Sequence, residues 1–375
     1  MIAEIVRERG PLTVAAFMDL ALYHPEFGYY ARAAQRSGRA GDFFTSIDIG
    51  PLFGELVEVQ IAEMFRILRA TAPSGSAVSS FDLVEAGAGN GRLSADILRA
   101  ARDRDPELYA AVRLRLVEAS GAARDAQRAT LGDLADRLQS STASLPEDFE
   151  GAVVANELLD AMPVHQVVMR EDGLREVYVV ADANGDLQTI EGPPSTSALQ
   201  AHLERAGATL EPGWRVEIGL AAAEWMRDAA RRLTRGFIVL IDYGHPAPEL
   251  YSVSHSSGTL TTFSGHRSRG PEAADRQPPW LQRPGEQDIT AHVDFTSVRA
   301  AAEAEGLVSL GFLDQTYFLL GLLPSISSPQ TAIRNPQFKS LVMPGGLGST
   351  LKVLLLGKGV GAPALAGCSF SVRAT

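Results

Sequence analysis

Residues 81–93, FDLVEAGAGNGRL, constrain the fold most, because a short apolar strand there ends in an acid and runs into three alternate glycines. Helical spacing follows over residues 93–102, so the glycines lie in a strand-to-helix turn. Gly87, Gly89 and Gly91 have GxGxG spacing. Glycine permits the positive φ that such turns need, and it lets the backbone approach a flat nucleoside, which a side chain would block. The sequence therefore predicts a nucleotide-like cofactor at this turn.

The spacing of these glycines discriminates between nucleotide cofactors. A dinucleotide fingerprint, GxGxxG, would place its third glycine at Arg92, and a phosphate-binding P-loop would need Gly-Lys followed by Ser or Thr. We therefore favour S-adenosylmethionine over NAD or ATP. This cofactor carries a positive sulfonium and no phosphate, so Glu85 at the strand end suits it better than a basic anchor would. A glycine-rich turn without a ligand is the alternative.

A second acid strengthens the prediction of a nucleoside site. Residues 113–119, RLRLVEA, form a second apolar strand, and Glu118 near its end lies about thirty residues past the first glycine. An acid in this position can accept hydrogen bonds from both ribose hydroxyls, as in dinucleotide-binding folds. An ordinary solvated glutamate is the alternative. In register behind the glycine turn, Glu118 is better explained as a ribose ligand.

Composition bounds the partners of the chain. Its 375 residues are 45% hydrophobic and 21% charged, with a formal net charge of -11, which is typical of a globular protein with one enlarged α/β domain or two domains. An acidic balance offers no electrostatic footprint for nucleic acid, so we expect no nucleic-acid partner. No apolar run reaches the length of about 18 residues that a membrane span needs, so we expect no membrane partner either.

Cysteine and histidine usage bounds the chemistry and the compartment. Cys368 is the single cysteine, which excludes a disulfide framework within one chain. The seven histidines show no HExxH motif and no paired ligand spacing, so the sequence predicts no metal site. Residues 1–9 lack the apolar core of a secretory signal. We therefore expect a cytoplasmic location.

Outside the glycine turn, the pattern indicates helices, further strands and a hairpin. Apolar spacing predicts helices over residues 121–139, 219–235 and 295–305, and strands over residues 140–145, 151–156, 236–244, 307–313 and 352–356. Residues 164–190 alternate apolar and polar side chains around Asp172-Gly173 and Asn184-Gly185, which predicts antiparallel hairpins. Residues 246–284 are polar and rich in Gly, Pro and Ser, which predicts a long mobile loop.

These elements predict an α/β fold with four regions. The regions are a helical N-terminal lid over residues 1–70, a Rossmann-like core over residues 71–165 and 210–357, a β-hairpin substrate insertion over residues 166–209, and a frayed tail over residues 358–375. Within the lid, Thr13 and Asp48 are candidate helix caps.

Several runs resemble the MidA family, the mitochondrial complex I assembly methyltransferases and their bacterial relatives. The runs are GPLTVAAFMDLALYHPEFGYY at 10–30, GDFFTS at 41–46, FGELVE at 53–58, VEAGAGNGRL at 84–93, ANELLDAMPV at 155–164, IDYGH at 241–245 and GEQDITAHVDFTS at 285–297. The resemblance implies a class I methyltransferase fold dependent on S-adenosylmethionine, and a protein arginine side chain as acceptor. Ile47 and Asp48 stand where the family commonly has Pro-Glu, and residues after 323 depart from the family pattern.

Acids beyond the strand at residues 151–156 are our first candidates for acceptor binding. If the segment after Asn156 is helical, Glu157 and Asp160 share one face at the carboxyl edge of the sheet. Paired carboxylates hold a planar guanidinium well, through bidentate hydrogen bonds. The alternative is that Asn156 and Asp160 cap a turn and Glu157 is a solvated charge.

Further polar residues are weaker candidates. Asp42, Thr45 and Ser46 can hydrogen-bond the methionine end of the cofactor, with Phe43 and Phe44 excluding water or simply pinning the lid. His292 is a candidate pocket residue, although a histidine two residues from an acid, here Asp294, is more often structural. Asp242 and Tyr243 end a central strand and either face the ligand or cap the next turn.

Three functions remain open at this stage. The first is methylation of a protein side chain, arginine being favoured, by an enzyme dependent on S-adenosylmethionine. The second is methylation of a small molecule enclosed by the lid and the hairpin insertion. The third is a binding or assembly protein that retains the cofactor pocket without turnover. A homodimer is also left open.

Overall fold

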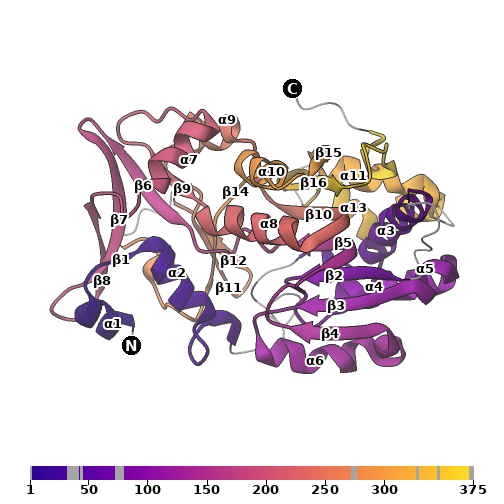
Figure 1. Cartoon of the computed structure of the whole chain (residues 1–375). Coiled ribbons are helices and arrows are strands. Elements are labelled where there is room, and N and C mark those ends of the chain that lie inside the picture. The colour runs from indigo at the N-terminus through magenta and orange to yellow at the C-terminus, as the bar shows by residue number, and fades with distance from the viewer. Residues whose placement is uncertain are drawn as a thin grey trace. The chain divides into compact units, whose positions relative to one another are not determined.

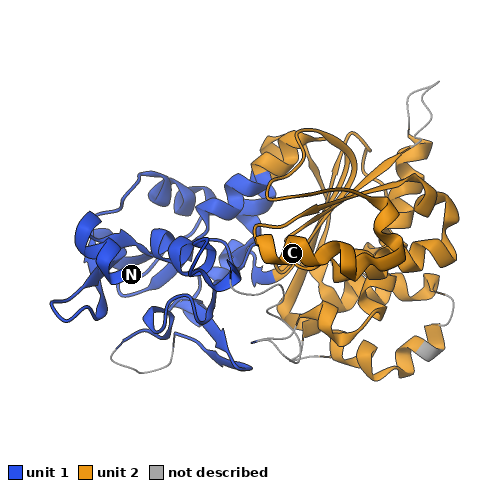
Figure 2. Cartoon of the chain, turned by 90° about the horizontal axis from the view of Figure 1, so that it is seen from below, with its two compact units in different colours: residues 1–43, 159–226, 243–301 blue, residues 44–158, 227–242, 302–375 orange. Residues whose placement is uncertain are grey.

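The computed structural model describes residues 2–31, 42, 45–71, 80–271, 277–326, 329–343 and 347–370. The chain divides into two compact units, and each is built from segments distant in sequence (Figures 1 and 2). Unit 1 comprises residues 1–43, 159–226 and 243–301, and unit 2 comprises residues 44–158, 227–242 and 302–375.

Unit 2 is built on a sheet whose strand order is β15-β16-β10-β5-β2-β3-β4. Its strands are β2 (Phe81–Ala86), β3 (Val112–Val117), β4 (Leu138–Thr142), β5 (Phe149–Asn156), β10 (Leu233–His245), β15 (Val308–Asp314) and β16 (Leu351–Lys358). The pairs from β4 through β10 are parallel, and β15 runs antiparallel to β16. All six residues of β2 are buried, as expected for a parallel strand covered on both faces.

Helices of unit 2 cover this sheet (Figure 1). They are α3 (Leu52–Ala70), α4 (Arg92–Arg104), α5 (Pro106–Ala111), α6 (Gly121–Leu131), the end of α8 (Leu220–Arg232), α11 (Gln315–Leu322), α12 (Pro329–Arg334), α13 (Pro336–Val342) and α14 (Leu347–Thr350). Phe65 of α3 packs edge-on against Phe81 of β2, with ring centroids 5.6 Å apart. This contact anchors α3 on the sheet, so the predicted N-terminal region 1–70 is divided between the two units.

The strand order reverses between β2 and β5. From β2 the chain adds β3 and then β4 on one side, and it returns to place β5 and then β10 on the other. In open α/β sheets, ligands bind at the carboxyl ends of the two strands that flank such a reversal. The glycine turn follows β2, and Glu157 follows β5, so both lie at this edge of the sheet.

Unit 1 contains an antiparallel sheet of strand order β1-β7-β6-β9, with β8 paired to β7. The strands are β1 (Leu12–Thr13), β6 (His165–Arg170), β7 (Gly173–Ala181), β8 (Leu187–Gly192) and β9 (Arg215–Ile218). The hairpins predicted over residues 164–190 are therefore present. The helices of this unit include α1 (Ile2–Arg9), α2 (Val14–Tyr23), α7 (Ala198–Ala206) and most of α10 (Phe295–Ala304). Thr13 caps α2 as predicted by accepting a hydrogen bond from the Ala16 N–H at 3.1 Å.

The segment predicted to be a long loop, residues 246–284, is instead largely structured. It contains α9 (Ala247–Leu250), η4 (Val253–His255), β11 (Thr261–Ser264), β12 (Arg267–Arg269) and η5 (Pro279–Leu281), and β11 pairs with β12 and with β13 (Asp288–Thr290). Buried apolar side chains hold the segment in place. One of them, Trp280, packs against Phe17 of α2 with ring centroids 5.6 Å apart.

The prediction of a frayed tail does not hold for residues 365–367, which pack against α3 of unit 2. The Gly367 N–H donates a hydrogen bond to Gln60 Oε1 at 3.1 Å, and the Ala366 N–H donates one to Glu63 Oε2 at 2.9 Å. Leu365 is buried. Among the residues described, no helix has both the length and the apolar character that a membrane crossing requires.

Candidate active site

The glycine turn after β2 has the backbone geometry that its sequence predicts. Gly87, Gly89 and Gly91 have φ of 70°, 50° and 87°, and Gly91 is the N-cap of α4. A Cβ at Gly87 would lie 3.0 Å from Leu158 Cδ1, and one at Gly91 would lie 3.3 Å from Leu116 Cδ1. A Cβ at Gly89 would meet no atom within 4 Å. The outer glycines thus allow close packing, and the middle one borders open space.

Glu118 contacts this turn directly. Its Oε2 accepts a hydrogen bond from the Gly89 N–H at 2.8 Å, and its Oε1 accepts one from the Ser120 N–H at 2.7 Å. The side chain is partly exposed. A carboxylate has about four acceptor positions, so Glu118 keeps capacity for the two ribose hydroxyls assigned to it.

Gln127 supports the same turn and was missed by the sequence analysis. It is fully buried in α6, and its Nε2 donates a hydrogen bond to the Gly89 carbonyl at 2.8 Å. Its Oε1 accepts one from the Ser141 hydroxyl at 2.6 Å. A glutamine on a helix carries no periodic signal of its own, so only the packing of α6 reveals its role.

Glu85 holds the start of α4. It is buried, and its Oε2 accepts hydrogen bonds from the backbone N–H and the hydroxyl of Ser94. Burial raises the pKa of Glu85 to about 7, although the Ser94 bonds oppose this shift. The carboxyl thus fastens the first turn of α4 to the end of β2, and its predicted contact with the cofactor stays a prediction.

The three candidates at residues 42–46 are engaged in different ways. Asp42 lies in unit 1, where its carboxylate accepts hydrogen bonds from the Tyr29 hydroxyl and the Gly265 N–H, both at 2.7 Å. Thr45 donates its hydroxyl to Asp48 Oδ2 at 2.9 Å, and Ser46 donates its hydroxyl to Gln315 Oε1 at 3.1 Å. Their predicted contacts with the methionine end stay predictions, and Phe43 and Phe44 lie outside the described residues.

Glu157 and Asn156 form a polar group at the end of β5. Glu157 has a φ of 51°, an uncommon value for a residue with a side chain and one often found at functional sites. Its Oε1 accepts hydrogen bonds from the Ser46 N–H and from Asn156 Nδ2, both at 3.1 Å. Asn156 Oδ1 is buried and finds no hydrogen-bond partner among the described residues. A ligand with N–H donors would satisfy it.

The electrostatic setting of Glu157 favours its protonated form. Burial raises its pKa to about 8, and the nearby carboxylate of Asp242 adds to this shift, whereas the Ser46 and Asn156 bonds oppose it. Asp242 is itself buried, three residues before the end of β10, and its Oδ2 accepts a hydrogen bond from the Leu158 N–H at 3.0 Å. Asp242 thus caps the turn that carries Glu157, whereas the predicted alternatives, a contact with the ligand or a cap on the turn after its own strand, stay predictions.

The predicted pairing of Glu157 with Asp160 on one helical face is wrong. Residues 157–162 form bends and a turn, so a separation of three residues does not align their side chains. Asp160 belongs to unit 1, where it is buried and its carbonyl accepts a hydrogen bond from the Ala291 N–H at 2.9 Å. It lies near Tyr30, whose pKa is raised well above its ordinary value, chiefly by burial and secondarily by Asp288.

His292 and Asp294 have separate partners in unit 1. Asp294 Oδ2 lies 3.1 Å from His202 Nε2 and accepts a hydrogen bond from the Ser297 hydroxyl at 2.6 Å. Its structural role is as expected, but its histidine partner is His202. The His292 ring lies beside His245 and His255, and burial lowers its pKa to about 4. A catalytic role for His292 stays a prediction.

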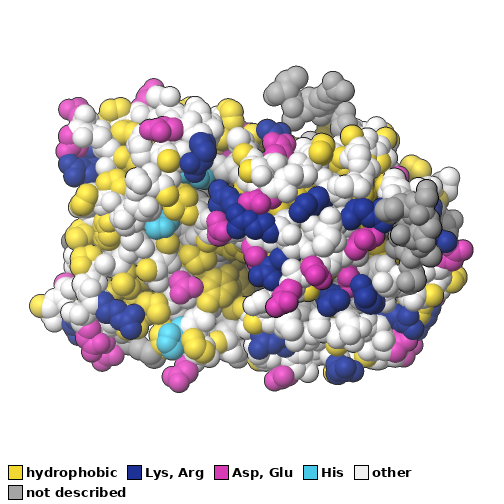
Figure 3. Space-filling view, viewed as in Figure 1, with side chains coloured by type: hydrophobic (Ala, Val, Ile, Leu, Met, Phe, Trp, Pro, Cys, Tyr) yellow, Lys and Arg dark blue, Asp and Glu magenta, His cyan; other side chains and the backbone are white. Residues whose placement is uncertain are grey.

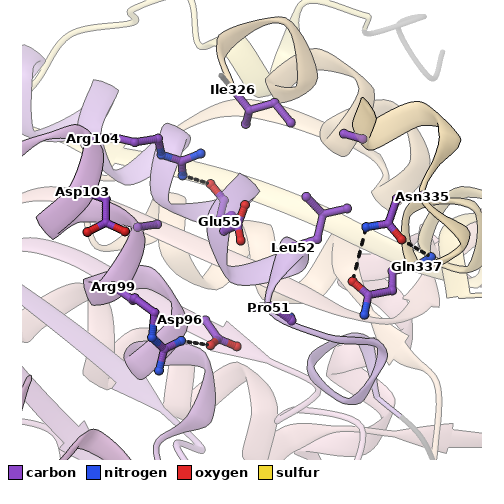
Figure 4. Close-up of a pocket in the computed structure, with 12 residues that line it drawn as sticks. Pro51, Leu52, Glu55, Asp96, Arg99, Asp103, Arg104, Ile326, Asn335 and Gln337 are labelled. Carbon is purple, nitrogen blue, oxygen red and sulfur yellow. Dashed lines mark hydrogen bonds and ion pairs between the residues drawn. The ribbon is translucent and has the colours of Figure 1, made fainter. Parts of the chain in front are cut away.

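A pocket of about 560 Å³ lies elsewhere in unit 2, between α3, α4 and the segment that contains α12 and α13 (Figure 4). Two of its arginines form ion pairs, Arg99 with Asp96 and Arg104 with Glu58, both at 2.6 Å. None of the residues of the glycine turn lines it. The carboxyl edge of the sheet, which carries the glycine turn, is therefore the better candidate for the cofactor site.

A doubly wound sheet, a glycine turn that borders open space and a carboxylate held against that turn define a methyltransferase that binds S-adenosylmethionine. The residues present fit this cofactor, because Gly89 leaves room for a nucleoside and Glu118 retains acceptors for a ribose. Residues 56–313 match the family described as "Putative S-adenosyl-L-methionine-dependent methyltransferase", and the chain belongs to that family.

Solved structures and curated relatives support this assignment. A crystal structure from Burkholderia thailandensis with S-adenosyl-homocysteine bound is 31% identical, has a TM-score of 0.85, and aligns over 99% of this chain and 94% of that one. The mouse protein arginine methyltransferase NDUFAF7 is 30% identical over 84% of this chain and 71% of its own length. The Drosophila melanogaster homologue is 28% identical over 94% and 82%, respectively.

These relatives correct one expectation. The mouse, fruit-fly and human proteins are all named as mitochondrial, which contradicts the cytoplasmic location expected from cysteine usage and from the sequence of residues 1–9. Neither feature specifies an organelle. On the face shown in Figure 3, Lys and Arg side chains are interspersed with Asp and Glu side chains.

Proposed function

We propose that this methyltransferase transfers a methyl group to an arginine side chain of a protein. The proposal rests on the acceptor group at the end of β5, in which the unpartnered Asn156 Oδ1 lies beside the Glu157 carboxyl. A guanidinium is planar, cationic and rich in N–H donors, so it matches such a set of oxygens. The names of the relatives, which are protein arginine methyltransferases, support the same acceptor.

Glu157 has two tasks in this proposal. Both of its hydrogen bonds from Ser46 and Asn156 go to Oε1, so Oε2 takes part in neither and is the atom we assign to the guanidinium. A cation at this position favours the ionised carboxylate and lowers its pKa. Binding of the cation thus releases the Glu157 proton to solvent, and the resulting carboxylate can accept the one proton that methylation of the guanidinium cation sets free.

At the cofactor, the main task of the protein is to position the bound molecule. Bound S-adenosylmethionine supplies the electrophilic methyl group. Glu118 holds the ribose, and Gln127 and Glu118 together keep the Gly89 backbone in place, so the turn is ordered before binding. Preorganisation of this kind is the main contribution that a protein makes to a direct displacement.

A transfer assay with tritiated S-adenosylmethionine tests the acceptor. We expect label in an arginine-containing peptide and none in the same peptide with lysine in place of arginine. Glu157→Gln should lower turnover by about tenfold to a thousandfold while leaving cofactor affinity unchanged. Glu107→Gln, at a carboxylate whose side chain is 76% exposed, is the control and should change neither turnover nor cofactor affinity.

Two results would contradict the proposal. Label that appears only in small molecules of a cell extract would identify a metabolite acceptor. Cofactor binding in calorimetry without any transfer, to either class of acceptor, would identify a binding or assembly protein.

A further inference from the structure

Three histidines from distant parts of the sequence meet in unit 1. His245 is the last residue of β10, His255 is the last residue of η4, and His292 lies between β13 and β14 (Val293–Asp294). Strands β10 and β14 are parallel neighbours, with Gly244 opposite Val293, which brings His245 and His292 together. Ring centroids are 4.8 Å apart for His245 and His255, 5.2 Å for His245 and His292, and 5.8 Å for His255 and His292.

We propose that His245, His255 and His292 bind a divalent transition-metal ion, Zn²⁺ being the best match. One nitrogen from each ring can be chosen so that all three lie within 4.8 Å of one another. Three imidazoles without a thiolate suit Zn²⁺ and its neighbours in the first row, whereas Mg²⁺ and Ca²⁺ require oxygen ligands. Each ring is partly exposed, so an ion can reach it from solvent.

The oxygens of Glu249 lie against two of the three rings. The Glu249 carbonyl lies 3.0 Å from His255 Nδ1, and because a carbonyl only accepts, this nitrogen carries the proton and Nε2 is left as the ligand atom. The Glu249 carboxylate lies 3.2 Å from His245 Nδ1. A carbonyl or carboxylate behind a histidine is the usual outer support of a metal site.

His292 adds an independent indication. Its Nδ1 is buried and has no hydrogen-bond partner among the residues that the structure describes. Buried ring nitrogens are normally paired, so this atom lacks the partner that an ion would provide. Tetrahedral Zn²⁺ with bonds of 2.0–2.1 Å separates its ligand nitrogens by about 3.3 Å, so the widest pair must close by about 1.5 Å.

The consequence of binding would be local to unit 1. His255 belongs to the connection that leaves β10, whereas His245 and His292 belong to paired strand ends. An ion shared by the three would fasten this connection to the strands, with a water as fourth ligand. Binding to the folded state alone raises the unfolding temperature. The inference does not depend on the identity of the methyl acceptor.

Calorimetric titration of the untagged full chain with Zn²⁺ tests the site. We expect one ion per chain, a higher unfolding temperature in the presence of Zn²⁺, and no heat of binding with Mg²⁺. His245→Gln, His255→Gln and His292→Gln should each weaken Zn²⁺ by at least about tenfold. His266→Asn, at an exposed histidine outside the cluster with a φ of 60°, is the matched control and should bind as the parent does.

A second measurement guards against variants that misfold. Tetrahedral Co²⁺ absorbs strongly in the visible range, and we expect this band from the parent and the His266→Asn variant alone, with circular dichroism confirming that all variants fold. Absence of a stoichiometric site in the parent would overturn the proposal. Equal loss of metal binding in His266→Asn and in the cluster variants would also overturn the proposal, because it would indicate nonspecific binding to histidines.

Discussion

The backbone N–H of Gly89 donates a hydrogen bond to Glu118 Oε2 at 2.8 Å. This bond joins the turn after β2 to the acid after β3, two features that the sequence places about thirty residues apart. The glycine borders open space, and the acid retains acceptors that face a ligand. Substitutions at these two residues are therefore two independent tests of the same cofactor site.

Gly89→Val should abolish binding of S-adenosylmethionine. The new side chain would occupy the open space beside the turn, and we expect the dissociation constant measured by calorimetry to rise at least about a hundredfold. Gly207→Val is the matched control, because Gly207 has a similar φ of 64° and equally open surroundings but lies at the end of α7. Both changes cost about 1–2 kcal/mol of stability because a side chain is strained at such positive φ. Equal affinity in the two variants would remove Gly89 from the cofactor site.

Glu118→Ala should weaken S-adenosylmethionine by about 1–3 kcal/mol, the range for a lost charged hydrogen bond. Glu118→Gln keeps one acceptor, so its affinity for S-adenosylmethionine should lie between those of Glu118→Ala and the parent. The control is Glu107→Ala, at an exposed glutamate paired only with Arg69 at the surface. If calorimetry gives the same affinity for Glu118→Ala as for the control, Glu118 does not hold the ribose.

Gln127→Leu should reduce both stability and cofactor affinity. The change keeps the side-chain volume but leaves the Gly89 carbonyl and the Ser141 hydroxyl without their partner, which costs about 1–3 kcal/mol in chemical denaturation. Gln200→Leu, on an exposed face of α7, should change stability by less than about 0.5 kcal/mol. A destabilised Gln127→Leu with full affinity would mean that the turn orders itself without this support.

Glu157→Gln should make the protein more stable at alkaline pH. The pKa of Glu157 is about 8 in the folded state against an ordinary 4.5, so between these values the folded state binds a proton that the unfolded state releases. Stability therefore falls as pH rises from about 4.5 through about 8. The glutamine of the variant does not ionise, so the variant does not lose stability in this way.

Thermal unfolding at several pH values measures this difference. We expect Glu157→Gln and the parent to differ little at about pH 5, and the variant to be more stable by about 1–3 kcal/mol near pH 9. Glu107→Gln, at the exposed surface carboxylate, should follow the parent at every pH. A constant difference between Glu157→Gln and the parent across this range would show that the carboxyl does not titrate as assigned.

Strand and helix periodicity located most of the nucleotide-binding core. The runs at residues 81–85 and 113–119 became β2 and β3 within one or two residues, since strands buried on both faces read as continuous apolar segments. The prediction failed where it depended on one assumed local structure. Glu157 and Asp160 would share a face only on a helix, and the chain turns there instead, with Glu157 at positive φ.

The loop and tail predictions failed for a related reason. Polar and glycine-rich composition over residues 246–284 hid a few apolar side chains, such as Trp280, that anchor the segment in the core of unit 1. Within the predicted tail, the backbone N–H groups of Ala366 and Gly367 donate hydrogen bonds to Glu63 and Gln60 of α3. A contact between segments so far apart has no local sequence signal, whereas composition averages over the whole segment.

The order of residues along the chain was enough to specify the glycine turn, the acid at each strand end and hence the class of cofactor, because these features depend on neighbours within one strand-turn-helix unit. Folding alone brought Gln127 beneath Gly89, gave Asp294 the partner His202, and gathered His245, His255 and His292. Each of these contacts joins residues from separate elements. Their distance in space is set by sheet order and packing, which no periodicity in the sequence encodes.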